Sequence, residues 1–362
     1  MPAPDGNPRT RPVPLAMLLA ALLFSGCTAA PSGRAGATAT DAGTAVPTTH
    51  APSSTGWAWT RPTYIGSQPD SGGVACRAGF GCLAGESSGS LLAATLVGRS
   101  LSSWRVVRRG VGGAAEAVAC APSALCIAVY AEAVAASPQP FHPGSAWRRT
   151  PLPVGFRASA SCPTSSLCLI GGSGGIIYSS RDPLSRSARW SAFNLNTAIP
   201  GYDSGIDSLT CPSKDLCLAG GSPGVMYWTR DPGADPPTWQ AAIEADSPID
   251  ALSCPSAGFC VAGTSHGRLL WSTDPASLDP LWRSRELRGK EPISSLSCPS
   301  TSSCTLGSAG GPLIWSPKQG PDGALSHMKH PDPSEATSLA CPSVRLCLEI
   351  DFEGRLVIGS AS

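Results

Sequence analysis

The stretch Ser208-Leu209-Thr210-Cys211-Pro212-Ser213-Lys214-Asp215-Leu216-Cys217-Leu218-Ala219-Gly220 decides how this chain folds. Two of its cysteines stand six positions apart, with Pro-Ser directly after the first. The same spacing occurs seven times, at Cys76 and Cys82, Cys120 and Cys126, Cys162 and Cys168, Cys211 and Cys217, Cys254 and Cys260, Cys298 and Cys304, and Cys341 and Cys347. Successive first cysteines lie 42 to 49 residues apart. A fixed period of about 40 to 50 residues is typical of stacked supersecondary units, including propeller blades.

Local composition predicts four short strands in the fourth unit. Residues 206–211 and 217–220 are rich in β-forming residues and flank a turn at 212–216. A third strand follows at 225–229, and Trp239 begins the fourth. Four strands in about 44 residues is the content of a propeller blade.

The remaining repeat architectures fit this sequence poorly. Leucine-rich repeats are shorter, and helical repeats do not tolerate 40 glycines and 36 prolines. We therefore predict one all-β domain over residues 57–362, a seven-bladed β-propeller with one disulfide per blade.

The two ends of the repeat block predict how the ring closes. The seventh unit ends one strand short after residues 355–358, and a spare strand at 57–60 precedes the first unit. This spare strand contains tryptophan, as the fourth strands of the other units do at Trp104, Trp147, Trp190, Trp239 and Trp282. We expect the N-terminal strand to complete the last blade, because closure removes exposed sheet edges.

The cysteine pairs are expected to be structural disulfides. Regularly spaced cysteines in even number imply disulfides in an exported protein. Zinc sites favour shorter spacings, and redox sites favour two intervening residues, so both alternatives are weaker. Fifteen cysteines leave one outside the seven pairs, and this is Cys27.

The N-terminus predicts export and a lipid anchor. Arg9 and Arg11 precede ten apolar residues at 15–24, which are too few to span a membrane. The following Ser25-Gly26-Cys27 resembles a bacterial lipobox, which implies a signal peptide over residues 1–26 and lipidation of Cys27 on the outer face of the cell membrane. Residues 27–56 consist mainly of Ala, Thr, Ser, Pro and Gly, so we expect a disordered tether.

Three units share a further motif after their third strand. It reads Ser180-Arg181-Asp182, Thr229-Arg230-Asp231 and Ser272-Thr273-Asp274, and a tryptophan follows each aspartate after eight residues. The motif resembles the Asp-box, or BNR, repeat of sialidase-type propellers. In that family the motif stabilises the fold, so the resemblance implies a propeller and leaves the activity open.

Motifs for catalysis or cofactor binding are weak. A sialidase needs an arginine trio, a nucleophilic tyrosine with a glutamate, and an acidic aspartate, and this pattern is missing around the five tyrosines. The segment 327–330 with Asp332 is better explained as a surface loop than as a metal site. A net charge of +1 and the lack of a basic run interleaved with aromatics argue against nucleic acid binding. We predict no metal and no cofactor.

Binding residues are expected on one rim of the ring. Turns between second and third strands lie on the same rim as the loops between blades, and this rim carries polar residues that differ from blade to blade. The candidates are Tyr202, Asp207, Asp250 and Lys290.

The sequence thus favours a monomeric, membrane-anchored, non-catalytic module that binds an envelope protein or polysaccharide. The alternatives are a glycoside hydrolase or another hydrolase on the same scaffold. By analogy with Asp-box propellers that assist photosystem II assembly, an assembly factor is a third possibility.

Overall fold

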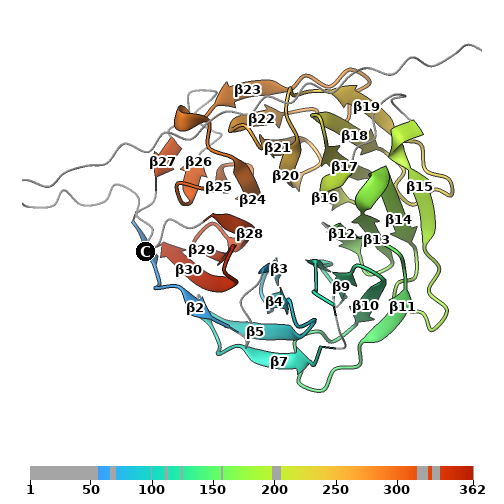
Figure 1. Cartoon of the computed structure of the whole chain (residues 1–362), viewed down its shortest axis with the longest axis vertical. Coiled ribbons are helices and arrows are strands. Elements are labelled where there is room, and N and C mark those ends of the chain that lie inside the picture. Colours follow the sequence, from blue (N-terminus) through green and yellow to red (C-terminus); the bar gives the residue numbers. More distant parts are fainter. Residues whose placement is uncertain are drawn as a thin grey trace, which may run out of the picture. The chain divides into compact units, whose positions relative to one another are not determined.

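The computed structural model describes residues 56–65, 71–98, 100–110, 113–123, 125–155, 158–197, 205–315, 325–327 and 335–361. Within these ranges the strands form seven antiparallel sheets that follow one another around a central axis (Figure 1). Each sheet is one blade, and the innermost strand of each blade carries the first cysteine of its pair. The structure confirms the predicted seven-bladed propeller.

The strands of the first four blades run outwards from the axis in chain order. Blade 1 contains β3 (Ser71–Arg77), β4 (Gly81–Glu86), β5 (Leu91–Val97) and β7 (Arg105–Arg108), with β6 (Ser100–Leu101) beside β5. Blade 2 contains β8 (Ala117–Cys120), β9 (Cys126–Tyr130), β10 (Ala133–Ser137) and β11 (Arg148–Pro151). Blade 3 contains β12 (Ser159–Thr164), β13 (Leu167–Gly171), β14 (Ile176–Ser180) and β15 (Ser191–Asn194). Blade 4 contains β16 (Ile206–Ser213), β17 (Leu216–Gly221), β18 (Val225–Thr229) and β19 (Gln240–Ile243).

The last three blades have the same arrangement, with the N-terminal strand outermost in blade 7. Blade 5 contains β20 (Ile249–Ser256), β21 (Phe259–Thr264), β22 (Arg268–Ser272) and β23 (Arg283–Glu286). Blade 6 contains β24 (Ile293–Ser300), β25 (Ser303–Ser308), β26 (Leu313–Trp315) and β27 (Leu325–His327). Blade 7 contains β28 (Ala336–Ser343), β29 (Leu346–Asp351), β30 (Arg355–Ala361) and β1 (Trp57–Trp59), with β2 (Thr63–Tyr64) also on β30. The 3-10 helices η1 (Ser173–Gly175), η2 (Leu195–Thr197) and η3 (Arg288–Lys290) lie in the connections.

Side chains of the second strands pack against both neighbouring blades. In β9, Cys126, Ala128 and Tyr130 belong to the core cluster shared with blade 1. The alternating Ile127 and Val129 belong to the cluster shared with blade 3. Successive residues of a strand point to opposite faces, so a strand between two blades must be apolar on both. This explains why β9 is buried at every position.

All seven cysteine pairs form the expected disulfides, one in each blade. The bonds join Cys76 to Cys82, Cys120 to Cys126, Cys162 to Cys168, Cys211 to Cys217, Cys254 to Cys260, Cys298 to Cys304 and Cys341 to Cys347. Each bond links the first and second strands of its blade across a tight turn.

The second cysteine of each pair is fully buried inside its blade. These residues are Cys82, Cys126, Cys168, Cys217, Cys260, Cys304 and Cys347. A sulfur atom enclosed in this way is closed to ligands and to thiol partners, because redox-active cysteines need access to solvent. The buried cysteines are therefore structural members of the core, and none of them belongs to a binding site.

The N-terminal strand closes the ring as predicted. β1 pairs antiparallel with β30, so that Trp57 lies opposite Ala361 and Trp59 opposite Gly359. A side chain at Gly359 would collide with the Trp59 ring, which a Cβ atom would approach to 2.7 Å. Nearer the axis, the Val74 amide of blade 1 donates to Ser338 Oγ of blade 7 at 2.9 Å. Both contacts join residues from opposite ends of the propeller sequence.

The predicted signal peptide and lipidation site, and the predicted tether up to residue 55, lie outside the described residues. Among the residues that are described, no helix is long and apolar enough to cross a membrane.

Candidate functional site

A cavity of about 480 Å³ opens at one end of the central channel. One position of the repeat, four residues before the first cysteine, contributes to its lining in every blade. The seven residues at this position are Gly72, Glu116, Ala158, Asp207, Asp250, Ser294 and Thr337. The scaffold therefore repeats this position seven times, while the side chain changes from blade to blade.

A β-bulge presents this position to the channel. In blade 4, Ile206 pairs with Gly221 and Ser208 pairs with Gly220, which leaves Asp207 as an additional residue of the inner strand. A bulge of this kind redirects a side chain and interrupts the regular ladder. The same register shift occurs at Asp250, Ser294 and Thr337.

Two hydroxyl groups in the lining already use their hydrogens within the ring. Ser294 Oγ donates to the carbonyl oxygen of Ala336 at 2.7 Å. Thr337 Oγ1 donates to the carbonyl oxygen of Ile350 at 3.1 Å. A hydroxyl has one hydrogen and two lone pairs, so both groups can offer only acceptor capacity to a ligand. Together with three carboxylates, they make the polar lining of this cavity rich in hydrogen-bond acceptors.

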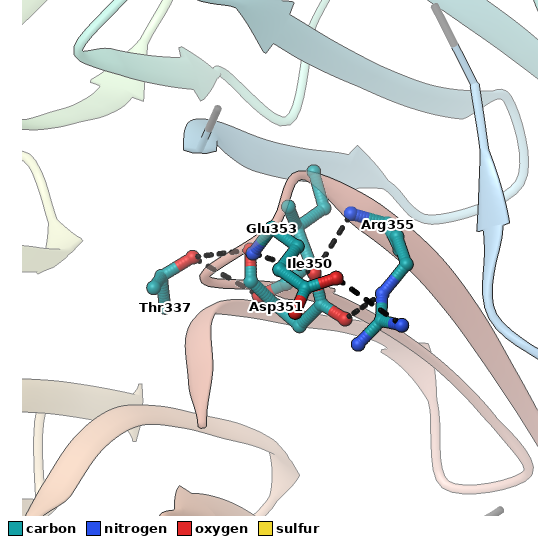
Figure 2. A network of polar contacts seen from close by, with 5 residues as sticks. All are labelled: Thr337, Ile350, Asp351, Glu353 and Arg355. Carbon is teal, nitrogen blue, oxygen red and sulfur yellow. Dashed lines mark hydrogen bonds and ion pairs between the residues drawn. The ribbon is translucent and has the colours of Figure 1, made fainter. Parts of the chain in front are cut away.

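Thr337 also contacts a charged network that fixes the neighbouring turn of blade 7 (Figure 2). The buried Asp351 accepts hydrogen bonds from the backbone amides of Glu353 at 3.0 Å and Arg355 at 2.8 Å. Its second oxygen pairs with Arg355 Nε at 2.7 Å, and Glu353 lies 3.3 Å from the same guanidinium. These contacts hold the β29–β30 turn beside the channel mouth, which is a structural role.

Further along the channel most of the lining side chains are apolar. A second cavity of about 280 Å³ is bordered by Cys120, Cys162 and Cys211 and by the prolines that follow them. Val118 borders both cavities, so the two are neighbours in the channel. The channel thus has an acceptor-rich mouth next to a section bordered by alanine, proline and disulfide side chains.

Serine side chains tie neighbouring inner strands together around this section. Ser161 Oγ accepts the backbone N–H of Cys211 in the next blade at 3.0 Å. Equivalent bonds join Ser253 to Cys298 and Ser297 to Cys341, each at 2.9 Å. The serine directly before the first cysteine therefore stabilises the contact between blades.

The structure places two of the predicted binding residues at the channel mouth. Asp207 and Asp250 are the second residues of the inner strands β16 and β20. Both residues line the channel mouth, half-buried, and the mouth is at the end of the ring where the rim was expected.

The other two predicted residues do not join them. Lys290 lies in η3 with a positive φ of 55°, in a separate rim pocket with His266 and Arg268. Its ammonium is 3.8 Å from Glu286 Oε2. Tyr202 lies outside the described residues.

The Ser/Thr-x-Asp motifs form turns at the opposite end of the ring. The amide of Asp231 donates to Thr229 Oγ1, and that of Asp274 donates to Ser272 Oγ, both at 3.2 Å. The Arg230 guanidinium bonds the carbonyl of Ala276 in the next blade at 2.9 Å. In these contacts the motif joins loops of the scaffold.

A strongly perturbed carboxyl lies away from the channel mouth. Burial and the nearby Asp351 raise the pKa of Glu349 to about 8. Glu349 is fully buried in the second strand of blade 7, within the packing of the sheet. In the described part of the chain, no group of three His, Cys, Asp or Glu side chains is arranged to hold a metal ion. Of the predicted surface loop at 327–330 with Asp332, only the backbone of residue 327 belongs to the described part of the chain.

Sequence reasoning missed Glu116, Ser294 and Thr337 as channel residues. An alignment of the seven units on their first cysteine places all three at the same position of the repeat as Asp207 and Asp250. The signal was therefore present in the spacing, although each residue is unremarkable within its own unit.

Comparison with known proteins supports the architecture. No protein-family model and no curated protein matches this chain. Among solved structures, the β-propeller domain of Myceliophteria thermophila Cps50 (Swd1) is similar, with a TM-score of 0.65 and 13% identity, over 83% of this chain and 98% of that one. The RRP9 WD40 repeats have a TM-score of 0.67 and 10% identity, over 83% and 97%. A chain of the mitotic checkpoint complex has a TM-score of 0.66 and 13% identity, over 91% and 99%. At these identities the likeness shows the fold alone.

Proposed function

We propose that this chain is a lipid-anchored, extracytoplasmic scaffold that binds a partner protein through the acceptor-rich mouth of its channel. The observation that carries this proposal is the ring of seven equivalent positions with a non-repeated set of side chains, four of which are presented by the same bulge. A rigid ring loses little conformational entropy on binding, which favours recognition. The solved WD40 structures are similar in fold and supply no partner for this chain.

The lining chemistry favours a donor-rich ligand. Carboxylates and hydroxyl oxygens whose hydrogens are already used accept hydrogen bonds from ammonium or guanidinium groups. A neutral polysaccharide offers donors and acceptors in similar number, so an acceptor-rich lining suits it less well. We therefore expect a lysine- or arginine-bearing protein segment as the partner, in place of the envelope polysaccharide that the sequence left open.

The experiment measures binding of hexalysine and of the neutral sugar cellohexaose to the full chain. Hexalysine is expected to bind, and Asp207→Asn/Asp250→Asn should weaken it about tenfold or more, since each hydrogen bond to a charged group contributes about 1.5 to 3 kcal/mol. Asp231→Asn/Asp274→Asn is the matched control, with the same charge change in the same two blades at the opposite end of the ring.

Partner proteins are then captured from intact cells with the unmodified chain and with each of the two double variants, and the partner is the protein that the Asp207→Asn/Asp250→Asn variant alone fails to capture. Equal binding of hexalysine by both double variants would refute the channel-mouth site. Hydrolysis of an envelope glycan that is abolished by a single carboxylate substitution would replace the scaffold proposal with the enzyme alternative.

A further inference from the structure

Arginines from two blades gather along one boundary on the outer wall of the ring. Arg105 and Arg108 come from β7, the outermost strand of blade 1, and Arg149 comes from β11, the outermost strand of blade 2. Arg105 Nη2 donates to the carbonyl of Phe141 in blade 2 at 2.9 Å. We call Arg105, Arg108 and Arg149 the arginine seam.

Tyr130 brings two of these guanidinium groups together. Arg108 Nη1 donates to the Tyr130 hydroxyl at 3.0 Å, and that hydroxyl donates to the carbonyl of Gly89 at 3.2 Å. The guanidinium carbons of Arg108 and Arg149 lie 5.6 Å and 5.9 Å from the centre of the Tyr130 ring. Because the ring is buried, it fixes the two cations in place on the surface.

A bulge in β7 allows two arginines of one short strand to reach the same boundary. Arg108 pairs with Leu91 and Val106 pairs with Leu92, so Val107 is the additional residue. Val107 is buried in the cluster between blades 1 and 2. Without the bulge, Arg105 and Arg108 would lie on opposite faces of the strand.

In the part of the chain that the structure describes, no acidic side chain forms an ion pair with the seam. Arg109 and Arg148 add two further exposed arginines on the same two blades. Two cations held around one ring repel each other, and an anion between them removes that repulsion. The sequence has no basic run interleaved with aromatics at this place, because these arginines come from segments about 40 residues apart.

The N-terminal segment joins the ring on blade 7, next to blade 1, which carries Arg105 and Arg108. β1 and β2 pair with β30 on the outside of blade 7, and Ile65 packs in the core cluster shared by blades 7 and 1. Figure 1 shows β2, β5 and β7 along one side of the ring. Val106, which is 51% exposed, adds an aliphatic side chain to this wall.

We propose that the arginine seam binds the phosphate groups of anionic phospholipids in the membrane that carries the lipid anchor. The inference builds on the proposed anchor and adds a surface contact to it. Guanidinium groups bind phosphate through paired hydrogen bonds, and basic side chains near an anionic membrane surface add to the attachment that an acyl anchor provides. The nearby N-terminal segment and the exposed Val106 favour a membrane over a soluble phosphate compound.

The test uses the chain from residue 27 onwards with Cys27→Ser, which removes the predicted signal peptide and any acyl chain. Sedimentation with vesicles of phosphatidylcholine containing 30% phosphatidylglycerol measures the seam, and vesicles of phosphatidylcholine alone are the reference. Binding is expected only to the anionic vesicles and should fall as salt rises. Arg108→Gln/Arg149→Gln should weaken it about 30-fold, because each arginine near an anionic surface contributes about 1 kcal/mol.

Arg283→Gln/Arg288→Gln is the control, with the same charge change at exposed arginines of blade 5 and η3. Unchanged melting temperatures establish that both variants fold. Equal loss of binding in the two variants, or no loss in the seam variant, would overturn the proposal. Competition by millimolar inorganic phosphate together with failure to bind vesicles would assign the seam to soluble phosphate compounds instead. The anchor is tested separately by the intact mass of the natural protein. If that protein carries no lipid at Cys27 while the Cys27→Ser protein binds anionic vesicles, the seam proposal stands and the anchor is refuted.

Discussion

Replacing Glu349 with glutamine should remove a pH dependence from the stability of this protein. Glu349 is fully buried in β29, at a position filled by Ala84, Ala128, Ile170, Ala219, Ala262 and Leu306 in the other blades. It lies on the same face of the strand as Cys347, whose sulfur is 3.4 Å from Thr305 Oγ1 of blade 6. Burial first, and then the charge of Asp351, raise its pKa to about 8.

The sign of the effect follows from proton binding. The ordinary pKa of a glutamate in an unfolded chain is about 4.3, so the folded state holds this proton more tightly. Folding stability therefore falls as the pH rises from the unfolded value to the folded one. At 1.36 kcal/mol per pKa unit, Glu349 alone is expected to lower the free energy of unfolding by about 4 kcal/mol between pH 5 and pH 8, to order of magnitude.

Urea unfolding of the oxidised protein at pH 5, 6, 7 and 8 measures this quantity. Glu349→Gln should be more stable than the unmodified protein at pH 8 and should lose much of the pH slope. Glu349→Leu, which copies Leu306 of blade 6, should behave similarly. Glu132→Gln, at an exposed position, should keep the slope. If Glu349→Gln kept the full slope, the reasoning that Glu349 is protonated at neutral pH would be wrong.

Three further predictions test the scaffold and the anchor. Cys211→Ala/Cys217→Ala should lower the free energy of unfolding by roughly 2 kcal/mol, because the loop of five intervening residues is short; urea unfolding checks this, and peptide mapping without reduction should find all seven pairs within their own blades. Deleting residues 28–55 should leave the melting temperature almost unchanged, whereas deleting 28–62 should lower it, because only the second removes β1 and its pairing with β30; equal melting temperatures would contradict closure by β1. Cys27→Ser should release the protein from the membrane or leave an uncleaved precursor, and intact mass of the membrane-bound protein without an acyl group on Cys27 would contradict lipidation.

The repeated features of the fold could be read from the sequence because each carries the same information seven times. The six-residue spacing seen at Cys211 and Cys217 recurs in every unit and predicts the first turn of every blade. The additional strand at Trp57 corresponds to the fourth strand that the last unit lacks. The first two strands of blade 4 extend beyond their predicted ends at Cys211 and Cys217, because Ser213 pairs with Leu216. Lys290 was placed on the correct rim, because rim membership depends only on strand order.

The register at Asp207 could not be predicted in the same way. A bulge adds one residue to a strand without a distinctive side chain, so the predicted strand at 206–211 did not show that Asp207 is the additional residue. The register becomes visible only when Ile206 and Ser208 are found opposite consecutive residues of β17. The arginine seam was harder still, since Arg108 and Arg149 meet only after two blades have packed on Tyr130.

The two proposed surfaces are compatible because they face in different directions. The seam lies on the outermost strands, whereas the acceptor-rich mouth lies on the axis, at one end of the inner strands. If the wall of blades 1 and 2 rests on the membrane, the axis runs roughly parallel to the bilayer and the channel mouth stays open to solution. A contact through either end of the ring would instead place the channel mouth or the Ser/Thr-x-Asp loops against the lipid. The outer-wall arrangement therefore leaves Asp207 and Asp250 accessible to a partner while the arginines are occupied, and each set can be substituted without disturbing the other.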